Sequence, residues 1–164
     1  MFKWLRAARD KAPGLPPAEP NWRSDTWKFC NCEIKDKPAQ ALVNTGIRPS
    51  APDPQRTTLL WVAVYCRMPP AGGFWDPAET ETLDKIEYYL ADTVTTKLNA
   101  AYVLQVTTPG IREYYFYASS DKGLGDCVAA TRGFFPEYKI ESDQWQDAEW
   151  SRYLTFYDYA TQKG

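Results

Sequence analysis

The sequence predicts an α+β fold, and two observations carry that prediction. The run Thr58–Met68 is the longest apolar stretch of the chain, is rich in β-branched and aromatic residues, and ends at Pro69, which indicates a central strand. The segments that follow it switch between the two-residue repeat of strands and the three-to-four-residue repeat of helices. We therefore expect one sheet packed against helices.

Two segments precede the expected domain, which we place at residues 22–164. Residues 1–21 comprise a basic segment and the proline-rich linker 13–20, whose prolines exclude regular helix or strand. For the basic segment, an amphipathic helix at a membrane surface and a frayed terminus are the alternatives. The domain then begins with a β-hairpin whose strands are Thr26–Ile34 and Pro38–Gly46, and this hairpin either extends the sheet or folds over one of its faces.

The helix after the central strand has the clearest start signal in the chain. Asp76 is placed to cap it, Pro77 occupies the first helical position, and Glu79 completes a capping box. The apolar residues of this helix recur at spacings of three and four and predict one buried stripe: Leu83, Ile86, Leu90, Val94 and Leu98. Its acidic residues are expected to form a solvated face, with a surface for a basic partner as the alternative: Glu79, Glu81, Asp84, Glu87 and Asp92.

The remaining segments complete a familiar order. We expect strands at 101–107 and 111–118, a helix at 120–135, a strand at 137–142 and a terminal helix capped by Asp147. From the central strand onward the order is strand, helix, strand, strand, helix, strand. This is the order of a ferredoxin-like βαββαβ unit, an antiparallel sheet with both helices on one face. The N-terminal hairpin and the C-terminal helix are additions to that unit.

The two faces of the central strand differ in character. Leu60, Val62 and Val64 are expected to face the helices, because successive strand residues point to opposite sides. Residues of three strands then form the opposite face: Trp61, Tyr65, Arg67, Val103, Gln105, Tyr115 and Tyr117. Whether the hairpin or the terminal helix covers this second face decides where a partner has room to bind.

The composition of the chain narrows the range of functions that it can have. The chain has no histidine, which excludes histidine acid–base catalysis and histidine metal sites, and we expect no enzyme activity. The formal net charge of −2 and the pI near 5.2 disfavour a nucleic-acid partner, and no apolar span is long enough for a membrane helix. The four cysteines lie within expected strands and a helix, which indicates reduced thiols and a cytoplasmic protein.

Neither a cofactor nor a metal is expected. Cys30 and Cys32 are close in sequence, but a metal site at this spacing lacks the second pair of ligands that zinc needs. We interpret both residues as small buried hydrophobic side chains.

The candidate binding residues combine aromatic rings with charge: Trp61, Tyr65, Arg67, Arg112, Glu113, Tyr115 and Tyr117. Aromatic residues on the central strands of such a sheet stack bases in RNA-recognition domains, so single-stranded RNA is an alternative ligand. The chain is acidic, however, and its third strand lacks the glycines of that motif. A histidine-free hydrolase is a further alternative and requires a deep pocket with two convergent carboxylates.

Several short motifs occur in a characteristic order: Trp27–Phe29, Pro38–Gly46, Leu60–Val62, Gly110–Ala118 and Glu149–Tyr153. This series resembles the bacterial domain of unknown function family 695 and covers about residues 22–159. Some members of that family resemble, or are fused to, the ribonuclease E inhibitor B domain, which is ferredoxin-like and works by binding a protein. The resemblance thus implies that fold, a non-catalytic binding role and no defined catalytic residues.

Together these observations predict a non-catalytic protein-binding module. We expect a regulator, inhibitor or immunity-type protein of a bacterial partner that uses an aromatic and acidic surface. An acidic surface suits a basic partner, because opposite charges accelerate encounter between the two proteins.

Overall fold

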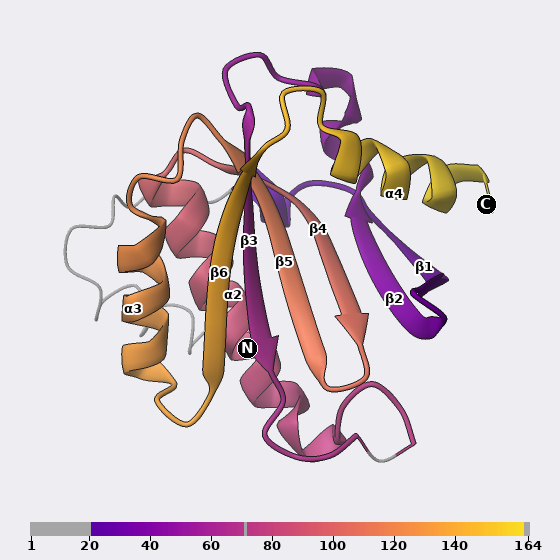
Figure 1. Ribbon diagram of the computed structural model, residues 1–164, viewed down its shortest axis with the longest axis vertical. Helices are drawn as coiled ribbons and strands as arrows, with labels where there is room; N and C mark the ends of the chain where they lie inside the picture. Colours follow the sequence, from indigo (N-terminus) through magenta and orange to yellow (C-terminus); the bar gives the residue numbers. More distant parts are fainter. Residues whose placement is uncertain (1–20, 71, 163–164) are drawn as a thin grey trace.

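Six strands form a single antiparallel sheet, which confirms the predicted α+β fold (Figure 1). The computed structural model describes residues 21–70 and 72–162, so the predicted N-terminal segment and linker lie outside the described residues except for Asn21. Strands β4, β5, β3 and β6 have the neighbour order of the ferredoxin-like unit. The sheet order is β1-β2-β4-β5-β3-β6, with the bounds β1 Trp27–Ile34, β2 Lys37–Asn44, β3 Thr58–Tyr65, β4 Ala101–Thr108, β5 Ile111–Ala118 and β6 Lys139–Gln146.

Two helices cover one face of the sheet, as predicted. In Figure 1, helix α2 (Thr80–Lys97) passes behind the strands and helix α3 (Leu124–Phe134) lies beside β6. Their apolar residues form one core with Leu60, Val62 and Val64 of β3. This assigns that side of β3 to the helices and leaves the other side of the strand for the second face.

Helix α4 (Ser151–Gln162) packs on the opposite face, against the hairpin strands β1 and β2 (Figure 1). Three short 3-10 turns complete the secondary structure: η1 (Asn21–Arg23), η2 (Thr45–Ser50) and η3 (Pro77–Glu79). In the described part of the chain, no helix is long and apolar enough to cross a membrane.

The N-terminal hairpin extends the sheet, which is one of the two alternatives that the sequence allows. Lys35 and Asp36 join β1 to β2, and both have positive φ angles, 50° and 65°, as in a two-residue hairpin turn whose twist matches that of the strands. Strand β2 then pairs with β4, from Gln40 opposite Thr107 onward. The sheet thereby gains two strands at the β4 edge.

A β-bulge in β4 reverses the predicted faces of the second half of that strand. The register between β4 and β5 shifts between Tyr102 and Leu104. Tyr102 packs in the helix-side core as predicted, but Leu104 and Val106 belong to the core on the other side. The prediction for Gln105 is wrong as well, because it pairs with Tyr114 and faces the helices. One inserted residue turns over every side chain that follows it.

Strand β6 and helix α3 have bounds that differ from the predicted ones. Strand β6 begins at Lys139 and continues to Gln146, beyond the predicted end at residue 142, because it pairs with the whole length of β3. Helix α3 begins at Leu124, since Gly123 has a φ of 96° that a right-handed helix excludes.

Glu79 does not complete the predicted capping box. Asp76 does cap the helix start, since its carboxylate accepts a hydrogen bond from the Ala78 N–H (2.9 Å). Glu79 is buried, and its carboxylate accepts three hydrogen bonds from outside the helix: from Arg67 N (2.8 Å), Met68 N (3.0 Å) and the Tyr138 hydroxyl (2.8 Å).

These hydrogen bonds draw the chain away from the sheet, so β3 ends at Tyr65 and not at Met68 as predicted. Arg67 accordingly does not join the second face. Its guanidinium carbon lies 6.0 Å from the ring centroid of Tyr138, which belongs to the helix-side core. The prediction for Arg67 is wrong because the alternation of a strand ends where its backbone leaves the ladder.

The acidic side of α2 is only partly solvated, contrary to expectation. Besides Glu79, Asp92 is buried and accepts a hydrogen bond from the indole N–H of Trp22 (3.1 Å). It also forms an ion pair with Arg23. The acidic residues of this helix thus anchor segments that lie far away in the sequence.

Replacing Glu79 with Gln should lower the free energy of unfolding by roughly 1–3 kcal/mol at neutral pH, because an amide cannot accept from all three buried donors. Burial acts to raise the pKa of Glu79, but the hydrogen bonds from Arg67, Met68 and Tyr138 outweigh it and lower that pKa. The stabilisation is therefore present above the ordinary carboxyl range and is lost as the pH falls through the lowered folded-state pKa. Urea unfolding at neutral and acidic pH measures both effects.

Glu81→Gln on the same helix is the matched control for this variant. Glu81 is exposed and contacts Lys85 one turn away (3.0 Å), so its replacement should leave the urea midpoint unchanged. An unchanged midpoint for Glu79→Gln would show that the carboxylate does not hold the end of β3.

Candidate functional site

The C-terminal helix covers part of the second sheet face. Trp150, just before α4, stacks on Tyr117 with ring centroids 4.2 Å apart and an interplanar angle of 7°. Tyr153 is buried and donates a hydrogen bond to the carbonyl of Asn44 at the end of β2 (2.6 Å). Tyr115 and Tyr117 are both buried on this side of the sheet. Two of the candidate binding residues are therefore packing residues.

Asp147 holds the start of α4, as the sequence predicts. Its carboxylate accepts hydrogen bonds from the N–H groups of Ser151 (2.9 Å) and Arg152 (3.1 Å) and from the hydroxyl of Tyr117 (2.7 Å). Burial acts to raise the pKa of Asp147, but these hydrogen bonds outweigh it and lower the pKa. One carboxylate thus joins the helix to the sheet.

The rest of the second face is open among the described residues. Trp61 and Tyr65 of β3 are half-buried, and Trp145 of β6 is 45% exposed. Three carboxylates lie on the same side of the sheet as these rings. We call this surface the aromatic–acidic face: Trp61, Tyr65, Glu113, Glu141, Asp143 and Trp145.

Strand register places the carboxylates of this face around its rings. Glu113 on β5 and Glu141 on β6 both lie opposite Ala63, so a small residue separates the two acids. Asp143 lies opposite Trp61. The face therefore has acids on β5 and β6, on either side of the β3 strand that carries Trp61 and Tyr65.

Each half-buried ring on this face is tied to one carboxylate. The Trp61 indole N–H donates to Glu113 Oε1 (2.8 Å), and the Tyr65 hydroxyl donates to Glu141 Oε2 (2.8 Å). The second hydrogen bond raises the pKa of Tyr65 and lowers the pKa of Glu141. Lys139 Nζ lies 3.2 Å from Glu141 and 4.6 Å from the Tyr65 ring centroid, so this face already holds one cation.

Arg112 lies on the other side of the sheet from Glu113, its neighbour in sequence. The candidate site groups it with Tyr115 and Tyr117, but the strand alternation turns it towards the helices. Its Nη1 atom lies 3.5 Å from Asp84 Oδ1 and 3.9 Å from Glu87 Oε2. The candidate residues therefore do not converge on one site.

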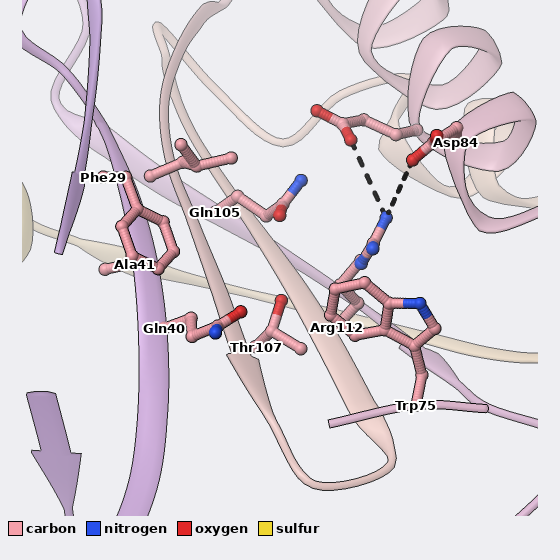
Figure 2. A pocket seen from close by; sticks show the side chains of 10 residues that line it. Phe29, Gln40, Ala41, Trp75, Asp84, Gln105, Thr107 and Arg112 are labelled. Atoms are coloured by element: carbon pink, nitrogen blue, oxygen red, sulfur yellow. Dashed lines mark hydrogen bonds and ion pairs between the residues drawn. The ribbon is translucent and has the colours of Figure 1, made fainter. Parts of the chain in front are cut away.

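Arg112 helps to line a cavity of about 200 Å³ on the helix side of the sheet. Figure 2 shows Arg112 and Gln105 extending from neighbouring strands towards α2, with Phe29 and Trp75 at opposite sides. The hairpin, β4, β5, α2 and the segment around Trp75 all contribute to its wall. The residues that give it its chemical character are Phe29, Leu42, Trp75, Glu87, Gln105 and Arg112.

Glu87 is the less exposed of the two acids of this cavity, with 19% of its side chain exposed against 44% for Asp84. Burial raises its pKa, and the opposing effects of Arg112 and of the hydrogen bond from the Tyr102 hydroxyl (3.2 Å) do not cancel that increase. Glu87 therefore takes up a proton more readily than an exposed glutamate.

Sequence reasoning missed candidate functional residues on the aromatic–acidic face and in the cavity at Arg112. Trp145 and Asp143 lie beyond the predicted end of the last strand, although the alternation that includes Lys139 and Glu141 continues through both of them. Glu87 carries no comparable signal, because a polar position on an amphipathic helix does not show which strand side chain it meets.

None of the four cysteines, which all lie in the described part of the chain, forms a disulfide. Cys30 and Cys32 lie in or against the core of the second face, as expected for small hydrophobic residues. Within residues 21–70 and 72–162, no cluster of three or more cysteine or carboxylate side chains is suited to hold a metal ion.

The family of unknown function DUF695 matches residues 25–157 of this chain. No curated protein and no solved structure matches this chain. The match covers most of the domain and confirms the resemblance that the short motifs indicate.

Replacing Asp147 with Ala should lower the free energy of unfolding by about 1–2 kcal/mol, because α4 loses its N-terminal acceptor and Tyr117 loses its partner. Amide hydrogen exchange throughout α4 should be faster in the variant than in the wild type, and the increase should be larger in α4 than in the sheet. Glu149→Ala is the control, since Glu149 is exposed two residues further along. Unchanged protection of α4 in Asp147→Ala would contradict this role.

Proposed function

We propose that this chain, which belongs to the family of unknown function DUF695, is a non-catalytic protein-binding module. Its role would be that of a regulator, inhibitor or immunity-type protein of a bacterial partner in the cytoplasm. The observation that carries this proposal is the aromatic–acidic face. Its rings are left half-buried or exposed beside α4, where aromatic side chains offer large contact area at a low cost in conformational entropy.

The charges of this face favour a partner with exposed arginine or lysine. Three carboxylates, Glu113, Glu141 and Asp143, surround rings that are able to take a cation against their faces. Lys139 already binds this way within the chain, through Glu141 and the ring of Tyr65. A guanidinium from a partner is suited to repeat that arrangement at Trp61 and Trp145.

The overall charge acts in the same direction. A net charge of −2 attracts a basic protein over several ångströms and raises its rate of association at low salt. Such attraction adds more to the association rate and to specificity than to the lifetime of the complex.

The hydrolase alternative has less geometric support. Asp84 and Glu87 do converge at the cavity, but both approach the same guanidinium nitrogen of Arg112. Hydrolysis by two carboxyl groups requires them to act on opposite sides of a scissile bond. The arrangement of Asp84 and Glu87 around Arg112 is better suited to binding a ligand than to hydrolysing one.

An affinity pull-down from the native lysate tests the protein-binding proposal. Wild-type protein should retain a basic partner, and Trp145→Ala and Asp143→Lys should each reduce that retention by roughly tenfold. Retention should also fall as the salt concentration rises. Trp145 and Asp143 are exposed, so neither substitution removes a core contact.

Gln144→Ala provides the matched control for that experiment. Gln144 lies between the two test positions on β6 but pairs with Leu60, and therefore points to the other side of the sheet. Its replacement should leave retention unchanged. Retention of no protein by the wild type, or equal retention by Trp145→Ala, would refute the proposal.

Single-stranded RNA should not bind, because Tyr115 and Tyr117 are buried and have no free ring face for a base. Fluorescence anisotropy with a labelled single strand at low salt measures this directly. Salt-sensitive binding that Tyr115→Ala or Trp145→Ala weakens would establish the RNA alternative in place of protein binding.

A further inference from the structure

Arg112 is a buried cation with weak compensation. Its side chain is only 5% exposed, yet its two ion-pair contacts are long, 3.5 Å and 3.9 Å, and both go to Nη1. The ring of Trp75 covers it, with the guanidinium carbon 4.5 Å from the ring centroid. A guanidinium has five N–H donors on three nitrogens, and both of these contacts use the same nitrogen.

Three buried polar atoms in this region lack hydrogen-bond partners among the described residues: Arg112 Nε, Gln105 Nε2 and the Tyr114 hydroxyl oxygen. Gln105 lies near Glu87, and Tyr114 lies near Arg112, close enough to affect the neighbouring pKa, but neither approach has the geometry of a hydrogen bond. All three groups are able to donate. Buried donors without acceptors are uncommon, so these atoms call for an acceptor from outside the chain.

The charges around Arg112 leave room for an anion. Asp84 is 44% exposed and therefore screened by water. Glu87 lies further from Nη1, at 3.9 Å, and is 19% exposed, and burial raises its pKa. A ligand with one negative charge would pair with the buried cation more effectively than either carboxylate does at these distances.

The rest of the cavity is small and mostly apolar. Phe29, Leu42 and Trp75 line it together with the polar side chains of Gln40 and Thr107, and Phe29 is 51% exposed. Figure 2 shows the rings of Phe29 and Trp75 on either side of the polar groups. A volume of about 200 Å³ lies below the range of drug-sized sites and limits the ligand to a small molecule.

We infer that this cavity binds a small organic carboxylate with a flat apolar body. The carboxylate accepts hydrogen bonds from Arg112 Nε and Gln105 Nε2, and the apolar body lies between Trp75 and Phe29. The site is separate from the aromatic–acidic face, since Arg112 and Glu113 point to opposite sides of β5. It therefore does not depend on the proposed protein-binding function.

Titration of the full chain with benzoate and phenylacetate, followed by two-dimensional NMR, tests this inference. Both probes should shift the side-chain N–H signals of Trp75, Gln105 and Arg112 in a saturable way. The matched amides, benzamide and phenylacetamide, have the same rings without the charge. They should bind at least about tenfold more weakly, because they lose the charge-assisted hydrogen bonds.

Three variants locate the carboxylate within the cavity. Arg112→Gln and Gln105→Leu should each abolish saturable binding of phenylacetate. Glu87→Gln keeps the shape of that side chain without its charge, and should bind phenylacetate at least as tightly as the wild type. Because Arg112 is buried, Gln105→Leu decides the result if Arg112→Gln does not fold.

The pH dependence gives an independent readout. The groups that face Glu87 are Asp84 from α2, Tyr102 from β4 and Arg112 and Tyr114 from β5. Ionisation of Glu87 adds negative charge beside the ligand, so wild-type affinity should fall as the pH rises through the raised pKa of Glu87. Glu87→Gln should remove most of that dependence.

Several results would overturn the inference. These are equal affinity for the amides and the acids, no saturable shift up to about 10 mM probe, or shifts that map to the aromatic–acidic face. Undiminished binding by Gln105→Leu would do so as well. Charge-selective shifts at Trp75 and Arg112 that Gln105→Leu removes would support it.

Discussion

Strand β3 pairs along its whole length with β5 on one side and with β6 on the other, and this double pairing fixes the direction of each neighbouring side chain. Leu60, Val62 and Val64 point into the helix-side core, and Trp61 and Tyr65 point to the opposite face. A slip of one residue would exchange the two sets and expose the most apolar strand of the chain. The helix-side core holds this register, and both candidate sites depend on it.

The same alternation places two different surfaces back to back on β5. Arg112 and Glu113 are consecutive, yet one faces the cavity beside α2 and the other faces the aromatic–acidic surface. The helix side presents a buried cation and donors without acceptors. The other side presents carboxylates beside half-buried rings. The helix side therefore suits an anionic ligand and the other side a cationic one. A substitution on one surface does not directly contact a ligand bound at the other.

Buried or half-buried carboxylates hold the irregular segments against the sheet and α2. Glu79 holds the backbone after β3, and Asp147 joins the start of α4 to Tyr117. Asp92 ties α2 to Trp22 and Arg23. Each acid accepts more than one hydrogen bond, which lets it remain charged although it is taken out of water. Acidic residues that look like a solvated helix face in the sequence thus decide where the strand ends and where the flanking segments dock.

The sequence by itself determined the order of elements, the two-sided character of β3 and the cap at Asp147, because local periodicity and capping chemistry act over a few residues. It did not determine the face of Gln105, since the bulge after Tyr102 arises from pairing with β5. Nor did it determine that Tyr117 is buried under Trp150 while Trp145 is exposed, because that depends on where α4 docks. The cavity at Arg112 is formed where the hairpin, sheet and α2 meet, so it was visible only in the tertiary structure: contacts between residues far apart in the sequence decide which charges are buried together.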